Sequence, residues 1–232
     1  MSYQYIKFSH QDGVGELVFN RPDVLNSFNM PMAKEVQDAL KTCAEEDTIR
    51  AVLMTGEGRA FSAGQDLAEA APSDAPWPDI SQIVRESYNP IIRSIREMEK
   101  PVVAVVNGVA AGAAANIALA CDIVIASEKA SFLQAFCHIG LIPDSGGTFF
   151  LPRLVGFARA TAMAMLGEKI SAQQALEWGM IYKVVPADEL MKEARQLASY
   201  LATRATRGLG LIKQALNQSL SNDLEAQLEV EA

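Results

Sequence analysis

The chain has 232 residues, of which 50% are hydrophobic, and its formal net charge at pH 7 is −8. This length and composition can bury a full-sized core as one domain with an appendage. The acidic balance argues against a protein that binds nucleic acid or an anionic membrane surface. Cys43, Cys121 and Cys137 show no paired spacing, so we expect free thiols in a reducing cytoplasm. The first residues do not have the pattern of a signal peptide.

Turn residues and hydrophobic periodicity divide the N-terminal part into short elements. Asp12-Gly13 between two apolar segments indicates a β-hairpin. Asn29 is the expected N-cap of a helix with Pro31 in its first turn, and Pro90 should bend or interrupt a later helix. In chain order, we predict strands at residues 5–8 and 15–19, a helix from 30 to 46, a strand at 51–54, a small-residue turn over 60–67, a Pro-rich surface loop at 71–78 and a helix over 80–99.

The stretch from residue 101 to 147 organises the predicted fold. It contains, in order, an apolar strand, a run of small residues, a helix-period segment and a second apolar strand, at residues 102–106, 109–115, 116–121 and 122–126. The stretch is long enough to cross a bilayer, but Asn107, Asn116 and Asp122 interrupt it. Buried strands of α/β proteins have the same apolar density, so we expect a buried core and no membrane span.

The C-terminal part is predicted to be mostly helical. We expect helices at residues 145–155, 158–166 and 172–178, a strand at 181–185, and helices from 188 onward. Gly208 and Gly210 are expected to mark a joint between two of these helices. The order predicts an α/β layer structure with a helical C-terminal appendage, divided into a core, residues 1–190, and a helical region, residues 191–232.

Several common functional patterns are missing from the sequence. There are only two histidines, and neither His-Glu-x-x-His nor a Cys-x-x-Cys pair occurs, so we expect no metal site. Gly-x-Ser-x-Gly, P-loop and dinucleotide-binding motifs are also absent. We therefore expect no nucleotide cofactor and no serine-hydrolase chemistry.

Two small-residue turns and one carboxylate remain as candidates for chemistry. The turns are at residues 63–65 and at Gly112-Ala113, and the carboxylate is Asp144. Main-chain N–H groups that converge on a carbonyl oxygen form an oxyanion hole, and a nearby carboxylate can then move a proton from the adjacent carbon. Two structural alternatives stay open: Asp144 as a helix N-cap, and the turns as sites of close packing.

A group of motifs resembles the crotonase (enoyl-CoA hydratase/isomerase) superfamily along almost the whole chain. They occupy residues 20–22, 25–28, 61–67, 101–112, 120–126, 140–147 and 170–175. The resemblance implies a crotonase-like spiral of repeated strand–strand–helix units. It also implies an acyl-CoA substrate, no cofactor beyond the CoA of that substrate, and a homotrimer or dimer of trimers. The family holds the thioester oxygen with two backbone N–H groups, which match Gln65 and Ala113.

The same resemblance assigns further site residues. Hydratases of the family use two glutamates, and the matching positions here are Asn116 and Phe136, so hydration is disfavoured. Asp144 matches the acting carboxylate of family isomerases and dehalogenases. Beside Asn116 and Phe136, the residues expected to contact substrate are Ala63, Asp66 and Leu67.

Within the family, residues 25–29, 64–67, 88–90 and 208–215 resemble the branch of ring 1,2-epoxyphenylacetyl-CoA isomerases in phenylacetate degradation. This implies rearrangement of a ring epoxide to an oxepin, with double-bond shifts as a related activity. Thioester hydrolysis, dehalogenation and non-catalytic binding of CoA thioesters remain alternatives. His138 and Cys137 are more simply read as structural than as a dyad. Family chains generally run further than this one, so we expect residues 191–232 to be an incomplete helical region.

Overall fold

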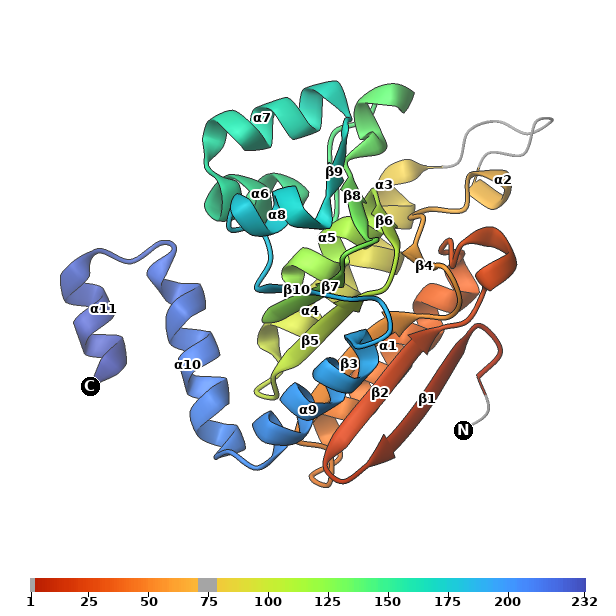
Figure 1. Ribbon diagram of the computed structural model, residues 1–232. Coiled ribbons are helices and arrows are strands. Elements are labelled where there is room, and N and C mark those ends of the chain that lie inside the picture. Colours follow the sequence, from red (N-terminus) through yellow and green to blue (C-terminus); the bar gives the residue numbers. More distant parts are fainter. Residues whose placement is uncertain (1–2, 71–78) are drawn as a thin grey trace.

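The computed structural model describes residues 3–70 and 79–232 (Figure 1). Its larger sheet has the strand order β1-β2-β3-β5-β7-β10, in which only the β1–β2 pair is antiparallel. These strands are β1 (Ile6–Gln11), β2 (Val14–Phe19), β3 (Ala51–Gly56), β5 (Val102–Val106), β7 (Ile123–Ser127) and β10 (Lys183–Val185). The predicted hairpin is confirmed, and Asp12 and Gly13 both have positive φ at its turn, 51° and 82°. The loop predicted at residues 71–78 lies outside the described residues.

A smaller sheet of short strands runs beside the larger one. Its order is β4-β6-β8-β9, formed by β4 (Ala60–Ser62), β6 (Val109–Ala111), β8 (Ser131–Leu133) and β9 (Lys169–Ser171). β3, β5 and β7 of the larger sheet are each followed along the chain by a strand of the smaller sheet, β4, β6 and β8. This succession confirms the predicted repeat of strand, strand and helix.

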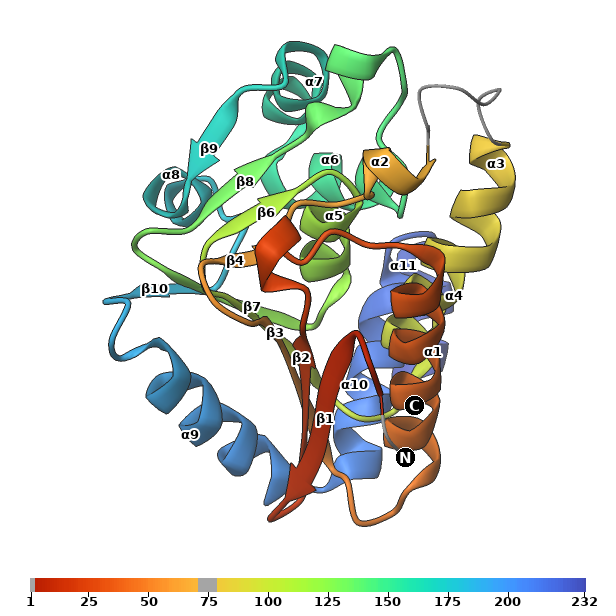
Figure 2. The ribbon, with the colours of Figure 1, turned by 90° about the vertical axis from the view of Figure 1, so that its right-hand side faces the viewer.

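Both faces of the larger sheet are covered by helices (Figure 2). Alternate residues of the parallel strands point to opposite faces. Leu53, Val103 and Ile125 pack in one cluster with α9 (Leu190–Ala202). Met54, Ala104 and Val124 belong to the other cluster, with residues of α1 (Met30–Glu45), α4 (Asn89–Glu97) and α5 (Ala113–Ala120). Burial on both sides explains why these strands are apolar without interruption.

The first helices follow local signals in the sequence. Asn29 caps α1 as predicted, since its side chain accepts a hydrogen bond of 3.0 Å from the N–H of Met32. The helix expected over residues 80–99 is divided into α3 (Ile80–Ile83), a π-helical turn (Val84–Tyr88) and α4. The predicted interruption at Pro90 is confirmed, and it takes the form of a widened turn just before that residue.

The C-terminal part contains the remaining helices. They are α6 (Gly147–Val155), α7 (Phe157–Leu166), α8 (Ala172–Glu177), α9, α10 (Thr206–Ser219) and α11 (Leu224–Glu231). The joint expected at Gly208 and Gly210 is wrong, because α10 runs through both residues. A Cβ atom on Gly210 would lie 2.7 Å from the Cβ of Glu99, so this glycine permits close packing.

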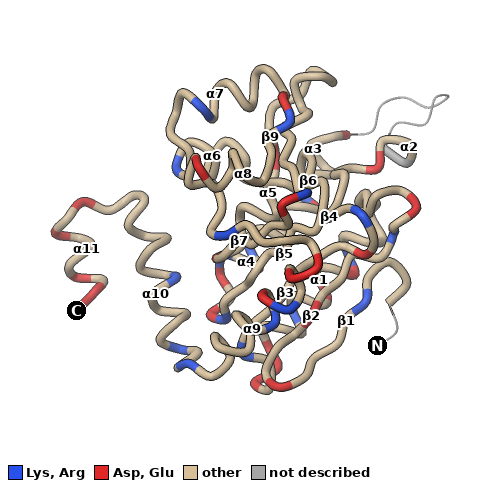
Figure 3. Tube along the Cα trace, in the orientation of Figure 1, with Lys and Arg blue, Asp and Glu red and all other residues tan. Residues whose placement is uncertain are grey.

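α10 and α11 extend away from the sheets, whereas α9 lies against the larger sheet (Figure 1). Acidic residues lie toward both ends of α11, and basic residues lie along α10 (Figure 3). The division at residue 190 stays a prediction. Within residues 3–70 and 79–232, every helix is too short or too polar to cross a bilayer.

Candidate active site

The first predicted turn connects β4 to α2 (Leu67–Ala70) and is held by main-chain contacts. The N–H of Phe28 donates to the carbonyl of Gly64 at 2.7 Å, and the N–H of Asp66 donates to the carbonyl of Phe28 at 2.8 Å. Phe28 and Gln65 thus form a parallel bridge, in which Phe28 bonds to the residues before and after Gln65. The N–H of the residue between these two bonds points away from the partner strand. The N–H of Gln65 therefore points away from Phe28.

Glycine is required in this turn for two reasons. Gly64 has φ of +88°, which residues with a side chain rarely adopt. A Cβ atom there would also lie 2.7 Å from the carbonyl oxygen of Ala111 and 3.7 Å from the amide nitrogen of Ala113. The first turn is thus packed directly against the second.

The second turn begins α5. Gly112 has φ of +55° and donates its N–H to the carbonyl of Leu133 on β8 at 2.8 Å. Its own carbonyl accepts from the N–H of Asn116, at 3.3 Å. Ala113 is the first residue of α5. Its N–H belongs to the first helical turn, where N–H groups have no acceptor within the helix. Such N–H groups and the helix dipole favour an oxygen that carries negative charge.

Gln65, Ala113 and Asp144 line one pocket with a volume of about 120 Å³. The elements that carry them lie together toward the upper end of the molecule in Figure 2. The other lining residues are Ala63, Leu67, Ile80, Ile83, Val84, Tyr88, Gly112, Ala135, Phe136, Ile139 and Leu141. Asp144 is the only carboxylate that lines the pocket in the described part of the chain. A second hollow, of about 500 Å³, shares Asp144, Ile80, Val84 and Leu141 with this pocket.

Asp144 is fixed in a tight turn ahead of α6. Its carbonyl accepts hydrogen bonds of 2.8 Å from the N–H of Gly147 and from the side-chain amide of Asn116. Its Oδ1 accepts a hydrogen bond of 2.7 Å from the Ser145 hydroxyl. The residue that caps α6 is Gly146, so the alternative of Asp144 as a helix N-cap is wrong.

The carboxyl group of Asp144 has an altered acidity. Burial raises its pKa from the ordinary value of 3.8 to about 6, and the hydrogen bond from Ser145 acts in the opposite direction. A carboxylate with a pKa near neutral pH is a stronger base than an exposed one, and it can hold or release a proton under ordinary conditions.

The structure separates the predicted substrate contacts into two groups. Ala63, Leu67 and Phe136 line the pocket together with Gln65 and Ala113. The other two predicted residues do not line it. The carboxylate of Asp66 forms an ion pair of 2.9 Å with Arg21.

Asn116 is completely buried, its amide donates to Asp144, and its oxygen accepts a 2.8 Å hydrogen bond from Gln134. Its placement favours support of the Asp144 turn over contact with substrate.

Sequence reasoning missed Tyr88 as a site residue, although the residue was part of a family motif. Tyr88 lines the pocket, and its hydroxyl donates a 2.7 Å hydrogen bond to the side-chain oxygen of Gln65.

His138 and Cys137 do not line the pocket. His138 Nε2 lies 3.1 Å from the carbonyl of Gly167. Among the described residues, no three His, Cys, Asp or Glu side chains are grouped so that they could hold a metal ion.

Comparison with known proteins places the chain in a family. Residues 9–232 match the family model described as enoyl-CoA hydratase/isomerase. The chain is 49% identical over 229 residues to 1,2-epoxyphenylacetyl-CoA isomerase of Escherichia coli, covering 98% of this chain and 87% of that protein. It is 43% identical over 232 residues to a probable enoyl-CoA hydratase of Rhodobacter capsulatus, covering 100% of this chain and 88% of the relative.

Solved structures agree with this assignment. The crystal structure of enoyl-CoA hydratase from Bacillus anthracis superimposes with a TM-score of 0.90 at 34% identity, covering 98% of this chain and 88% of that one. The crystal structure of an enoyl-CoA hydratase from Mycobacterium avium subsp. paratuberculosis superimposes with a TM-score of 0.87 at 35% identity, covering 99% of this chain and 91% of that one. The fold, the two turns and the sequence matches lead to the same conclusion: the chain belongs to the enoyl-CoA hydratase/isomerase family, the crotonases.

Proposed function

We propose that the protein is an acyl-CoA isomerase that rearranges ring 1,2-epoxyphenylacetyl-CoA to the oxepin and also shifts double bonds of enoyl-CoA thioesters. It uses no cofactor beyond the CoA of the substrate. The observation that carries the proposal is the pocket itself, which Gln65, Ala113 and the single carboxylate of Asp144 line together with apolar side chains of the described residues. The similarity to the Escherichia coli isomerase supports the ring epoxide as substrate.

The mechanism follows from the roles of these groups. The N–H groups of Gln65 and Ala113 hold the thioester oxygen, so the adjacent C–H becomes acidic. In a double-bond shift, the Asp144 carboxylate removes that proton and an enolate forms, whose negative oxygen is stabilised by the two N–H groups. The carboxylic acid then returns the proton to a different carbon. The elemental composition of the substrate is unchanged, so a single group can both accept and donate.

Two further observations support isomerisation over hydration. Water addition needs one group to activate water and a second to handle the proton, but Asp144 is the only carboxylate of the described pocket lining. Phe136, at the position of one hydratase glutamate, presents an apolar ring. The pocket volume of about 120 Å³ is comparable to that of cavities of roughly 150 Å³ that bind benzene, which suits a six-membered acyl ring.

The test is product analysis by chromatography and mass spectrometry. The purified protein is incubated with ring-epoxide, 3-enoyl, 2-enoyl and 4-chloroaryl thioesters of CoA. We expect products with the mass of the substrate but a different retention time from the first two. Gain of one water from the 2-enoyl thioester, release of free CoA or release of chloride would each replace the proposal by hydration, hydrolysis or dehalogenation. Tight binding without any turnover would indicate a non-catalytic CoA-thioester protein.

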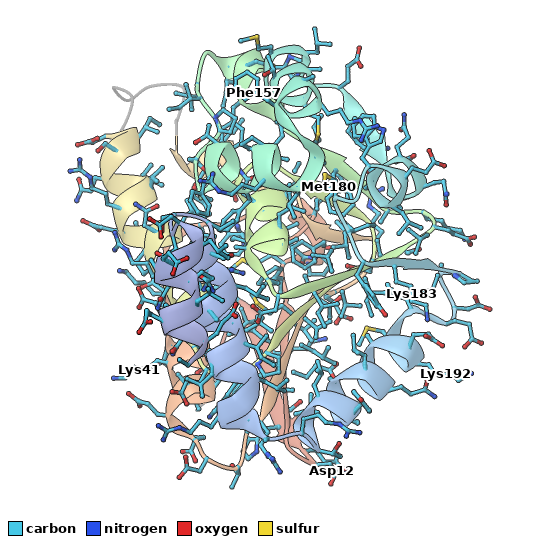
Figure 4. The ribbon with its side chains drawn as sticks, turned by 90° about the vertical axis from the view of Figure 1, so that its left-hand side faces the viewer. Asp12, Lys41, Phe157, Met180, Lys183 and Lys192 are labelled. Atoms are coloured by element: carbon cyan, nitrogen blue, oxygen red, sulfur yellow. The ribbon has the colours of Figure 1, made fainter. Side chains whose placement is uncertain are left out.

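We also propose that the protein is cytoplasmic and assembles as a homotrimer or a dimer of trimers. Large apolar side chains are exposed on the helices that extend from the core, Leu211, Ile212, Leu216, Leu224 and Leu228. Phe157 on α7 is 80% exposed and lies at the periphery (Figure 4). Exposed apolar groups in such number are typical of surfaces that bind other chains. Sedimentation equilibrium is expected to give a mass three or six times that of the chain, and a monomer would contradict it.

A further inference from the structure

Tyr88 lies at a position where three structural features meet. It is the last residue of the π-helical turn Val84–Tyr88, it is 1% exposed, and it lines the pocket. Its ring packs against that of Phe28 with the centroids 5.8 Å apart, and its hydroxyl donates to Oε1 of Gln65 at 2.7 Å. Tyr88 therefore contacts both the oxyanion donor Gln65 and Phe28, the residue that bridges to it.

The π-helical turn explains how Tyr88 reaches Gln65. The N–H of Asn89 donates to the carbonyl of Val84, five residues earlier, so this turn contains one residue more than an α-helical turn. Ser87 and Tyr88 are consequently both buried. Pro90 has no N–H to donate to a preceding carbonyl. The side-chain amide of Gln37 on α1 donates to the carbonyls of Glu86 and Ser87 at 2.7 and 2.9 Å and so ties this turn to α1.

The hydroxyl of Tyr88 is a dependable donor. Burial, with smaller contributions from the charges of Asp144 and Asp66, raises the pKa of Tyr88 well above its ordinary value. The hydroxyl is therefore protonated at neutral pH and can donate a hydrogen bond. Among the described residues, the other hydrogen bond of the Gln65 side chain is a long one, 3.4 Å from its Nε2 to the carbonyl of Asp66.

We propose that Tyr88 is a positioning residue, whose hydrogen bond to the Gln65 side chain fixes the direction of the Gln65 N–H toward the thioester oxygen. The inference rests on the proposed function, because it assigns Tyr88 a role in the same oxyanion site. Oxyanion donors act through preorganisation, so a small rotation of the donor weakens transition-state stabilisation more than ground-state binding. Tyr88 itself forms no bond to the reacting atoms in this proposal.

The kinetic test uses Tyr88→Phe, which keeps the ring and removes the hydroxyl. We expect kcat for a 3-enoyl thioester to fall about tenfold, less than the roughly 100- to 1,000-fold loss on removing a whole donor. KM is expected to change by less than about threefold. Tyr3→Phe is the matched control, because the Tyr3 hydroxyl donates a similar 2.8 Å hydrogen bond to Asp38 away from the pocket. Its kcat should equal that of the wild type. Wild-type kcat in Tyr88→Phe would overturn the proposal.

A double-mutant cycle with Gln65→Met tests the route of the effect. Methionine removes the acceptor of the Tyr88 hydrogen bond but keeps the backbone N–H. If Tyr88 acts through the Gln65 side chain, Tyr88→Phe has no further effect on kcat in the Gln65→Met background. Independent, multiplying effects would overturn the proposal. If Tyr88→Phe does not fold, Gln65→Met alone is the test, and we expect it to lower kcat by about tenfold as well. A wild-type kcat in Gln65→Met would then overturn the proposal.

A spectroscopic readout separates this inference from the proposed function. Phenylacetyl-CoA, isotope-labelled at its thioester carbonyl, is bound to each variant and measured by infrared difference spectroscopy. Hydrogen bonds to the carbonyl lower its stretching frequency, so we expect a shift back toward the free value in Tyr88→Phe and none in Tyr3→Phe. An unchanged frequency in Tyr88→Phe would overturn the role of Tyr88. Since this measurement needs binding only, it remains decisive even if the protein isomerises none of the thioesters tested.

Discussion

The two sides of the pocket are built on different principles. On one side, the N–H groups of Gln65 and Ala113 come from the main chain; Gly64 allows the two turns to approach closely, and Gly112 adopts a positive φ of 55°. On the other side, Asp144 and Tyr88 present their side chains. The Asp144 carboxylate accepts a hydrogen bond from Ser145, and the Tyr88 hydroxyl donates one to Gln65. The donor side therefore depends on the absence of a side chain at two positions. The carboxylate side depends on the identity of a side chain.

The largest effect is expected on the carboxylate side. Asp144→Asn keeps the size of the side chain but cannot accept the substrate proton, so kcat should fall by about 10³- to 10⁴-fold, the upper range for general base catalysis. Isothermal titration with phenylacetyl-CoA should show near-normal binding. Asp38→Asn, the same change at a residue outside the pocket lining, is the control and should retain activity. If Asp144→Asn turns over at the wild-type rate, Asp144 is not the acting base.

On the donor side, Gly64→Ala is expected to be nearly as damaging. The added Cβ would lie 2.7 Å from the carbonyl oxygen of Ala111, so the two turns must separate, and loss of one donor costs about 10²- to 10³-fold in kcat. Gly156→Ala is the matched control. Gly156 also has positive φ, +79°, but a Cβ there meets nothing within 4 Å.

Both variants should lose about 1 kcal/mol or more of stability from backbone strain, measured by urea unfolding. Only Gly64→Ala should lose kcat. Equal activities would mean that the close approach of the two turns is not needed for catalysis.

The same division governs how much the sequence could predict. The hairpin at Asp12-Gly13, the Asn29 cap and the long apolar strands were predicted correctly, because each depends on local chemistry. The strands of the smaller sheet were not predicted as strands. Each has only three residues, which is too short for a hydrophobic period to be recognised. Glycine was misread at residues 208 and 210, where α10 continues and its close packing on Glu99 is a tertiary contact.

For the site, the motifs brought Gln65, Ala113 and Asp144 to one pocket, but they did not predict Tyr88. The direction of the Tyr88 side chain depends on the π-helical turn, which contains one residue more than an α-helical turn. Gln37 of α1, about fifty positions earlier, donates to two carbonyls of this turn. A contact at that separation has no local signal in the sequence.

The altered acidity of Asp144 gives a pH-dependent prediction for the carboxylate side. The acting form is the carboxylate, so kcat/KM should fall about tenfold per pH unit below the pKa of about 6. The pKa is raised on folding, so between pH 3.8 and about 6 the folded state binds more protons than the unfolded state. The contribution of Asp144 to stability therefore falls as the pH rises through this window.

Asp144→Asn removes this titration. Near pH 8, above the folded-state pKa, the variant should be more stable than the wild type by about 3 kcal/mol, and the difference should shrink toward about pH 4.5. Urea unfolding at the two pH values measures it. A kcat/KM that stays level down to about pH 4.5 would contradict the altered acidity of Asp144.

The smallest effect is expected from Gln37→Met, which tests how the carboxylate side is supported from α1. The variant leaves the carbonyls of Glu86 and Ser87 without their amide donor, so stability should fall by about 1–2 kcal/mol. Because the π-helical turn orients Tyr88, kcat should also fall by about two- to threefold. Lys34→Met is the control, since the exposed Lys34 ammonium makes only a 3.3 Å contact with the Glu86 carbonyl. If Gln37→Met loses stability but keeps full kcat, Tyr88 is oriented by its packing on Phe28 and not by the turn that carries it.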